Sequence, residues 1–561
     1  MTDTLRLFQT QPTRKGGDTV IRSSASTPSP DERPAAPPAA GSREAAPTTA
    51  AEDPTPPVFS QDEALPALGQ DLALPAFDQD RALPTFGQDL ALPAFGQDRA
   101  LRIAVLGTGY LGATHAVCMA ELGFTVIGYD VDAAKVERLS VGEVPIFEPG
   151  LEELLRKNLE SGRLSFTTDV SQIARWADVH FVCVGTPQRA GDGGADLRYV
   201  DAAVDGLIAA GLAPGALIVG KSTVPAGTAA GLAARISAAA PDVELAWNPE
   251  FLREGFAVDD TLRPDRLVFG VTPGGAAEAR LRAVYAATIE AGTPVVVTDY
   301  ATAELVKVAA NAFLATKISF INAMAEICDV AGADVLELAT SIGYDARIGN
   351  RFLRPGIGFG GGCLPKDIRA FQARADELGA GASLAFLAEV DAVNLRARER
   401  AVALTRAALG GSVAGRRLGV LGAAFKPNSD DIRDSPALDI AAALAAEGAE
   451  VTVYDPAAIP NARLRYPTLA YAASAREAVS AADATLVLTE WAEFRTLDPA
   501  ALLVHVAGPV IIDGRHALDE RRWRDAGWTY HSLGRPGPTS AADLLPEAAD
   551  LPKGHGTRKG R

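Results

Sequence analysis

The sequence predicts an α/β protein in which two Rossmann-like domains flank a helical region, and three observations lead to this prediction. Short apolar runs of strand length alternate with helix-compatible segments between residues 101 and 300. The same alternation returns between residues 411 and 545. Residues 301–410 instead carry apolar side chains at helical spacing over long stretches. Because strands that alternate with helices are typical of parallel, doubly wound sheets, we expect two such domains joined by long helices.

The first domain should open on a strand from Arg102 to Leu106, a glycine-rich turn, an apolar helix, and a second strand that ends before Asp130. One long helix is expected after Asp299 and another from about Ala385 to Leu409. Further strands of the first domain are expected within HFVCVG, ALIVGKS, ELAW, RLVFGV and PVVVT, and strands of the second within GRRLGVLGAAFK, AEVTVYDP, ATLVLTEW and PVIIDGR.

The two ends of the chain are predicted to be disordered. Residues 1–100 include a stretch from Thr27 to Pro57 that is rich in Pro, Ala, Ser, Thr and Glu and cannot bury enough apolar area to offset chain entropy. Between residues 64 and 101 a nine-residue unit of the type ALPAFGQDR repeats. Its prolines oppose regular helix or sheet, which favours an expanded linker over a binding module. Residues 546–561 should form a second disordered segment.

Composition narrows the classes of molecule that the protein could bind. A net charge of −17 disfavours nucleic acid and acidic membranes, although a local cluster of cations could still bind an anionic small ligand. The chain has four cysteines without CxxC spacing, so neither a disulfide framework nor a metal site is expected. Because neither a signal peptide nor an uninterrupted apolar run of spanning length is apparent, we expect a soluble cytoplasmic protein.

The turn GTGYLG predicts a dinucleotide site. Gly107, Gly109 and Gly112 form GxGxxG between a predicted strand and a predicted helix, the context in which the pattern indicates close approach of a pyrophosphate to a helix N-terminus. Asp130 ends the next strand, where an acidic side chain receives ribose hydroxyls. A 2′-phosphate would meet a like charge there, so NAD is favoured over NADP.

The run GFGGGCLPKD predicts a nucleophile. Cys363 stands at the start of a predicted helix, where the helix N-terminus and Lys366 would favour a thiolate, and Pro365 suits the first helical turn. A buried, inert cysteine in a glycine turn is the alternative for the run taken alone.

Two further pairs of polar residues stand four apart. Glu250 and Glu254 in NPEFLREG would share a face if this segment were helical, and would otherwise be a solvated acidic turn. Lys307 and Asn311 lie among alanine, valine and leucine on the predicted long helix, so the lysine either reaches solvent or serves as an oxyanion donor. Spacing does not choose between these interpretations.

From about Arg102 to about Leu533 the chain resembles the UDP-glucose 6-dehydrogenases of the UDP-glucose/GDP-mannose dehydrogenase family. Two departures are a glycine at position 362, where several members have serine, and the N-terminal hundred residues. The motifs that carry the resemblance, in order, are GTGYLG with Asp130, VGTP, KSTVP, NPEFLREG, ELVKVAANAFLATKISFIN, RIGNRFLRPGIGFGGGCLPKD, FKPNSDDIRDSP and IIDGR.

The resemblance implies a four-electron oxidation of a sugar C6 alcohol to a carboxylate by two NAD+ in succession. Cys363 would capture the aldehyde as a thiohemiacetal and then carry a thioester. Lys307 with Asn311 would stabilise the oxygen of the intermediate. Asp367 would assist proton removal through a water that Thr223 helps to hold, and Glu254 would promote hydrolysis.

The resemblance also nominates binding residues and a homodimer, or a higher homo-oligomer, in which Arg347 reaches the neighbouring subunit's site. The residues implied for the UDP-sugar are Glu250, Lys307, Asn311, Arg347, Phe352, Gly360, Lys426 and Arg515. Those implied for NAD, besides Gly107, Gly109, Gly112 and Asp130, are Lys135, Thr186, Thr223, Glu254, Lys366 and Arg433.

Three alternatives remain at this point. The same chemistry could act on UDP-N-acetylmannosamine, UDP-N-acetylglucosamine or GDP-mannose, although RIGNRF and LPKD look more like the UDP-glucose branch. A two-electron hydroxyacid dehydrogenase would need neither Cys363 nor a second α/β domain with Arg515. A non-catalytic scaffold would act through the N-terminal repeats.

Overall fold

The structure is a computed structural model that describes residues 101–191 and 193–535. The first 100 residues and residues 546–561, for which disorder is predicted, lie outside the described residues. Leu101 precedes the first strand, as expected. The strands of the first sheet are β1 (Arg102–Leu106), β2 (Thr125–Tyr129), β3 (Leu164–Thr167), β4 (Val179–Val182), β5 (Leu217–Gly220), β6 (Glu244–Trp247), β7 (Leu267–Gly270) and β8 (Val295–Thr298).

These strands form one sheet in the order β3-β2-β1-β4-β5-β6-β7-β8. Neighbouring strands from β3 to β6 are parallel, but β7 pairs with β6 in the antiparallel sense, and β8 is parallel to β7. The prediction of a wholly parallel sheet is therefore wrong at this edge. Apolar runs report burial and not strand direction, so RLVFGV and PVVVT could not reveal the reversal.

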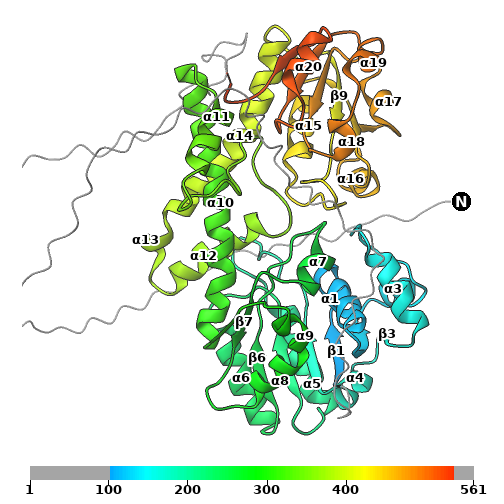
Figure 1. Cartoon of the computed structure of the whole chain (residues 1–561), viewed down its shortest axis with the longest axis vertical. Helices are drawn as coiled ribbons and strands as arrows, with labels where there is room; N and C mark the ends of the chain where they lie inside the picture. Colours follow the sequence, from blue (N-terminus) through cyan, green and yellow to red (C-terminus); the bar gives the residue numbers. More distant parts are fainter. Residues whose placement is uncertain (1–100, 192, 536–561) are drawn as a thin grey trace, which may run out of the picture. The chain divides into compact units, whose positions relative to one another are not determined.

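Helices cover both faces of this sheet (Figure 1). Helices α1, α3, α7 and α8 contribute buried residues to one apolar cluster with the sheet, while α4, α5 and α6 contribute to the other. The helices are α1 (Tyr110–Glu121), α2 (Ala133–Ser140), α3 (Leu151–Glu160), α4 (Val170–Trp176), α5 (Arg198–Ala210), α6 (Thr228–Ala239), α7 (Ala257–Leu262), α8 (Ala277–Val284) and α9 (Ala286–Glu290).

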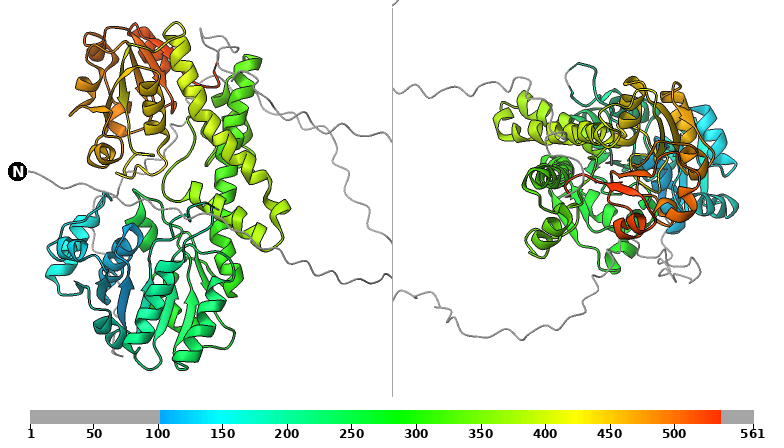
Figure 2. Two further views of the ribbon diagram at one scale, coloured as in Figure 1. Left: turned by 180° about the vertical axis from the view of Figure 1, so that it is seen from behind. Right: turned by 90° about the horizontal axis from the view of Figure 1, so that it is seen from above.

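The central region is helical, as predicted. It comprises α10 (Tyr300–Ala331), α11 (Val335–Gly343), α12 (Leu364–Glu377), α13 (Gly381–Leu384) and α14 (Phe386–Ala408). Helix α10 begins where the Asp299 side chain accepts the N–H of Thr302 and ends at Gly332, which is in the left-handed region. Figure 2 shows α14 lying alongside α10 from behind, and the buried ion pair of Arg400 and Asp329 joins the two helices.

Helix α10 is the single helix among the described residues that is long and apolar enough to cross a membrane, judged by length and composition. Its polar side chains Lys307 and Asn311 are buried within the protein, and it packs against α14 and β7. We therefore interpret α10 as the central helix of the fold.

The last domain has a parallel sheet in the order β11-β10-β9-β12-β13-β14. The sequence predicted the four inner strands of this sheet, but not its short edge strands or β3 of the first sheet, which have few apolar residues. The elements are β9 (Arg417–Leu421), α15 (Pro436–Ala446), β10 (Glu450–Tyr454), α16 (Ile459–Arg465), β11 (Ala470–Tyr471), α17 (Ala475–Val479), β12 (Ala484–Val487), α18 (Ala492–Arg495), α19 (Pro499–Leu503), β13 (Val510–Asp513), α20 (Glu520–Asp525) and β14 (Thr529–His531).

Candidate active site

The glycine-rich turn joins β1 to α1 at the carboxyl edge of the first sheet. Gly107 has a φ of +85°, and a Cβ on Gly112 would lie 1.7 Å from the carbonyl oxygen of Gly107, so no other residue fits at position 112. Helix α1 begins at Tyr110, so its N-terminus follows this turn directly. This backbone matches the cradle that a pyrophosphate requires.

Asp130 lies at the end of β2, beside this turn. Its Oδ2 atom accepts hydrogen bonds from the backbone N–H of Thr108 and from Nζ of Lys135, each at 2.8 Å. Burial alone would raise the pKa of Asp130, but these donors and the N–H of Asp132 lower it below its ordinary value. Asp130 is therefore an anion at neutral pH, as reception of ribose hydroxyls requires, and the structure brings Lys135 to it.

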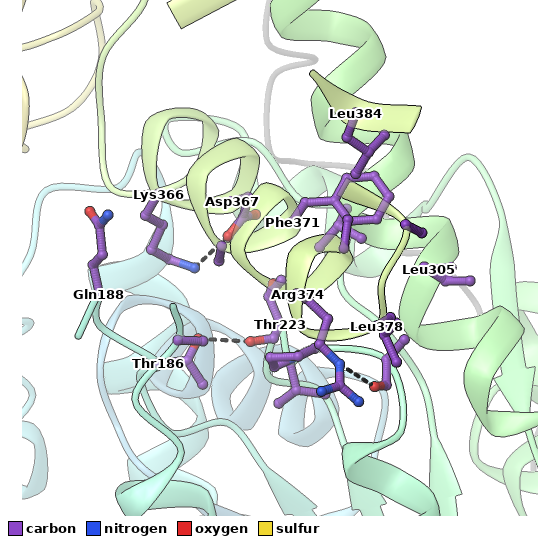
Figure 3. Close-up of a pocket in the computed structure, with 18 of the residues that line it drawn as sticks. Thr186, Gln188, Thr223, Leu305, Lys366, Asp367, Phe371, Arg374, Leu378 and Leu384 are labelled. Atoms are coloured by element: carbon purple, nitrogen blue, oxygen red, sulfur yellow. Dashed lines mark hydrogen bonds and ion pairs between the residues drawn. The ribbon is translucent and has the colours of Figure 1, made fainter. Parts of the chain in front are cut away.

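A cavity of about 270 Å³ brings four predicted site residues together (Figure 3). Thr186 and Thr223 line it from loops after β4 and β5, and the Thr186 hydroxyl donates to the Thr223 carbonyl at 2.8 Å. Lys366 and Asp367 line it from α12. The rest of the lining is largely apolar and includes Phe371. The cavity thus joins the first sheet to the helix that follows Cys363.

Cys363 immediately precedes α12, and of the four cysteines, all within the described residues, it alone is exposed. Although the residue is exposed, surrounding protein atoms remove part of the solvation of its thiol, which raises the pKa of Cys363, and the charge of Asp367 raises it further. Lys307 and Lys366 oppose the rise without cancelling it. The balance of these groups therefore favours the protonated thiol over the predicted thiolate.

Asp367 is a candidate general base next to this thiol. It is buried one turn along α12 from Cys363, and its N–H donates to the Cys363 carbonyl at 3.0 Å. Its two oxygens accept from Nδ2 of Asn311 at 2.7 Å and from Nζ of Lys366 at 2.5 Å. Lys307 is also buried, one turn before Asn311 on α10. The structure therefore brings the predicted lysine, amide and carboxylate together beside the thiol.

Glu254 lies on the loop after β6, close enough to Cys363 for its charge to act on the thiol. Of the two interpretations left open for Glu250 and Glu254, the shared helical face does not hold, because the backbone from residue 248 to residue 256 is not helical. A solvated turn does not describe Glu254 either, since this residue is buried. The Glu250 carboxylate accepts the N–H of Leu252, and Gly255 has a φ of +79°, both of which oppose a helix. Loss of solvation raises the pKa of Glu250, while Lys221 and Lys307 oppose the rise.

The Glu254 carboxylate contacts the last domain. Its oxygens accept from Oγ of Ser429 at 3.3 Å and from Nη2 of Arg433 at 3.2 Å. Burial raises the pKa of Glu254 to about 7, and the charge of Asp431 adds to the rise. Arg433, Lys426 and Ser429 oppose it. A carboxylate that titrates near neutrality suits a general base.

The position of the Arg433 side chain depends on the glycine at position 362. A Cβ at position 362 would lie 2.1 Å from Cζ of Arg433, so the glycine leaves space for the guanidinium beside Cys363 and Glu254. Gly360 is also buried, and a Cβ on it would lie 2.1 Å from the Asp434 carbonyl oxygen. The glycine run therefore packs tightly against the segment that carries Arg433.

Two further cations come from the last domain. Arg515 follows β13 and donates to the carbonyls of Gly358 at 2.7 Å and Leu488 at 3.0 Å, which joins the domain to the glycine run. Loss of solvation lowers the pKa of Arg515 and also that of Lys426. For Lys426 the opposing charges are those of Glu254 and Cys363. Lys426 therefore lies near Glu254 and Cys363, and Arg515 lies against the glycine run. Cations at these places could bind a diphosphate.

Arg347 is not brought into this cluster by the single chain. Its side chain is 89% exposed and forms an ion pair with Asp345. Phe352 is likewise exposed, with a φ of +63°. The two lie on the segment between α11 and α12.

Sequence reasoning missed Tyr110, Glu148, Ser429 and Asp431, which surround Glu254 in the structure. The contact between Tyr110 and Glu148 could not be predicted, because the two residues stand 38 apart in the sequence and no spacing rule links them. Within the described residues no group of three or more His, Cys, Asp or Glu could hold a metal ion.

Three regions of the chain match domains of one family: its NAD binding domain at residues 101–289, its central domain at residues 301–396 and its UDP binding domain at residues 419–520. A UDP-glucose 6-dehydrogenase of Rhizobium meliloti (strain 1021) is 43% identical over 78% of this chain and 100% of its own length. The chain belongs to the UDP-glucose/GDP-mannose dehydrogenase family. The resemblance read from the motifs is thereby confirmed, as are the α/β fold and the NAD cofactor.

Solved structures agree with this membership. A UDP-glucose dehydrogenase from the hyperthermophilic archaeon Pyrobaculum islandicum is 39% identical, with a TM-score of 0.71 over 78% of this chain and 99% of that one. A UDP-D-ManNAc dehydrogenase from Pyrococcus horikoshii is 27% identical, with a TM-score of 0.68 over 78% of this chain and 100% of that one. The protein is an NAD-dependent oxidoreductase, and its last domain is a UDP binding domain.

Proposed function

We propose that this enzyme oxidises the C6 alcohol of UDP-glucose to a carboxylate, with Cys363 as the covalent nucleophile. The observation that carries the proposal is the juxtaposition of one exposed thiol with a buried lysine, amide and carboxylate. A two-electron alcohol dehydrogenase has no use for the thiol, whereas oxidation to an acid requires a covalent or hydrated aldehyde. NAD+ supplies the hydride acceptor for each oxidation.

Four steps convert the alcohol to the acid. A hydride leaves C6 while the alcohol proton passes through water to Asp367, which gives an aldehyde. The sulfur of Cys363 adds to the aldehyde carbon, and the thiol proton is transferred to the oxygen, which gives a thiohemiacetal. A second hydride leaves the same carbon, the hydroxyl proton passes to solvent water, and a thioester remains. Water then attacks the thioester, the C–S bond breaks, and the acid and the thiol are restored.

The surrounding groups divide this work. Lys307 and Asn311 stabilise the negative charge that builds on the substrate oxygen, since both are buried and carry N–H groups that can donate to it. Thr223 helps to hold the water near Asp367. Glu254 activates the water that hydrolyses the thioester, and its pKa of about 7 supports that role.

The remaining predicted residues bind the two ligands. Lys426 and Arg515 attract the diphosphate from the last domain, while Glu250, Phe352 and Gly360 shape the sugar site. Gly107, Gly109, Gly112, Asp130, Lys135 and Thr186 bind NAD, together with Lys366 and Arg433. UDP-glucose is favoured over other nucleotide sugars because identity to the UDP-glucose dehydrogenases, at 43% and 39%, exceeds the 27% to the UDP-D-ManNAc enzyme.

We also propose a cytoplasmic homodimer in which a second copy covers the outer face of α10. Phe313, Phe320 and Ile327 stand seven residues apart on this helix and are 68%, 49% and 60% exposed. Such an apolar stripe is typical of a helix that packs against another. The partner copy would supply Arg347, whose exposed guanidinium the single chain leaves outside the site. Three buried free cysteines and one exposed one suit a reducing cytoplasm.

A substrate panel tests the proposal. UDP-glucose, UDP-N-acetylglucosamine, UDP-N-acetylmannosamine and GDP-mannose are each supplied with NAD+, and NADH is followed by absorbance. We expect UDP-glucose to give the highest kcat/KM and about two NADH per molecule oxidised.

Cys363→Ala should abolish formation of the acid while binding of both ligands stays within a few fold. Cys328→Ala, a change at a buried cysteine, is the matched control and should keep activity. Normal turnover by Cys363→Ala would refute the mechanism.

A further inference from the structure

Glu148 is a buried carboxylate that the proposed chemistry does not use. It lies in the loop between α2 and α3, and its residue is 7% exposed. Its Oε2 atom accepts the N–H of Gly255 at 2.6 Å and its Oε1 atom accepts the N–H of Ala257 at 2.7 Å. The Tyr110 hydroxyl also donates to Oε2. Each of these hydrogen bonds ends either in the glycine-rich turn or next to Glu254.

The hydrogen bonds to Glu148 determine how the backbone presents Glu254. The N–H of Gly255 belongs to the peptide group that directly follows Glu254, and it lies 2.8 Å from the Tyr110 hydroxyl oxygen as well. On the opposite side of Gly255 a Cβ would lie 2.6 Å from the carbonyl oxygen of Asn428, so this backbone is held between the first and last domains. Movement of the peptide would therefore move the Glu254 carboxylate.

The protonation states of Tyr110 and Glu148 support a fixed geometry. Burial raises the pKa of Tyr110, so the hydroxyl keeps its proton and remains a donor. Burial also raises the pKa of Glu148, and the hydrogen bonds from Tyr110, Gly255 and Ala257 oppose that rise. A carboxylate accepts from all these donors at once, whereas an amide in its place would present one NH₂ group to donors.

We infer that Glu148, held by Tyr110, is a positioning residue for Glu254 and links the glycine-rich turn to the group that acts on the Cys363 adduct. The inference rests on the proposed function, because it needs a hydrolysis step. Glu148 does not touch the reacting atoms; it acts through the backbone at Gly255. Since Tyr110 is the first residue of α1, the same contact connects the cofactor cradle with hydrolysis.

The test separates hydrolysis from oxidation. Glu148→Gln is mixed rapidly with saturating NAD+ and UDP-glucose, and NADH is followed through the first turnover and into the steady state. We expect a burst of about two NADH per site with a near-normal rate, followed by a steady rate lowered about tenfold. KM for both ligands should stay within a few fold. Mass spectrometry should find the acyl adduct on Cys363 during the slow phase.

Two further variants distinguish a positioning role of Glu148 from a general loss of structure. Tyr110→Phe removes only the hydroxyl and should lower the slow phase in the same direction, by about threefold. Glu244→Gln is the matched control, because Glu244 accepts the N–H groups of Ala276 and Ala277 at 2.9 Å from the start of β6, at the sheet edge away from the site. It should leave the partition between burst and steady state unchanged.

The outcomes distinguish the two levels of inference. If the unmodified enzyme forms NADH but Glu148→Gln and Tyr110→Phe both keep a normal steady rate, Glu148 does not position Glu254. The positioning role is also refuted if burst and steady rate fall in equal proportion. If the unmodified enzyme forms no NADH from UDP-glucose, the proposed function fails, and this inference fails with it.

Discussion

Burial raises the pKa of Glu254 to about 7, which lies within the pH range in which most enzymes are active. Arg433 is the main opposing charge, and it reaches Glu254 across the space left by the missing side chain of Gly362. Because the folded value lies above that of an ordinary carboxyl, Glu254 is protonated below pH 7 and ionised above it. Only the ionised form can take a proton from water, so hydrolysis should speed up as the pH rises through 7.

Glu254→Gln should remove that dependence and stall the enzyme after two oxidations. An amide cannot accept the proton of the attacking water, so we expect a burst of about two NADH per site and then a rate lowered by at least about a hundredfold. The slow phase should no longer rise with pH near 7. Stopped-flow absorbance from pH 6 to about pH 8 and the mass of the peptide that carries Cys363 measure both effects.

A different result would reassign the residue. If Glu254→Gln loses the burst while it still binds UDP-glucose, Glu254 takes part in hydride transfer or in positioning. The division of work among Lys307, Asp367 and Glu254 would then be wrong. Glu244→Gln again serves as the control, since it removes a carboxylate away from the site.

Among the elements, α10 has two separate tasks on its two faces. One face buries Lys307 and Asn311 beside α12 and thereby fixes the two groups that we propose as oxyanion donors. The outer face exposes Phe313, Phe320 and Ile327. A rigid helix of 32 residues can hold both sets in register, which would place the active site and the subunit contact on one element.

Phe320→Glu should therefore dissociate the enzyme. A carboxylate buried in an apolar interface without a partner costs several kcal/mol, enough to weaken a dimer more than a hundredfold. Light scattering coupled to gel filtration should report a monomer, and activity should fall with it. Leu464→Glu places the same charge on an apolar residue that is 85% exposed on α16 and should change neither property. A Phe320→Glu protein that remains a fully active dimer would mean that the contact lies elsewhere.

Subunit complementation tests the role of Arg347 in that dimer. Arg347→Ala and Cys363→Ala should each be inactive, but a refolded equal mixture should regain about a quarter of full activity. Half of the dimers are then mixed, and each has one site with both groups intact. An inactive mixture that contains the mixed dimer would place Arg347 in the site of its own chain.

At the scale of the whole molecule, the sequence predicted the α/β fold with a helical region between two Rossmann-like domains, and it proposed a catalytic set. The period of the apolar runs indicated the inner strands, and spacing paired Lys307 with Asn311 and Cys363 with Asp367. Only the family resemblance brought the two pairs together. The strands and the nearness of these residues within each pair were predictable because each depends on local pattern or on one short helical repeat. Their catalytic roles stay predictions.

The remaining features depend on distant segments. The antiparallel β7 and the non-helical path around Glu254 are decided by tertiary packing and by backbone hydrogen bonds. The space that Gly362 leaves for Arg433 and the contact of Tyr110 with Glu148 join residues far apart in the chain. Spacing rules reach only a few residues, so a single sequence could not reveal these contacts.

Removal of residues 1–100 should leave catalysis nearly unchanged. Every candidate catalytic and binding residue lies after Leu101, and β1 begins at Arg102, so the deletion takes away no part of the first sheet. The composition of the removed segment predicts no core of its own, and its loss should cost the fold little free energy of unfolding. We expect kcat and both KM values within about twofold of the full chain, and a thermal midpoint within about 2 °C. Steady-state NADH assays and thermal unfolding of the two proteins, prepared side by side, provide the comparison. A kcat lowered tenfold with an unchanged thermal midpoint would mean that these residues contribute to turnover itself, and the scaffold alternative, with its task in the repeats, would regain weight.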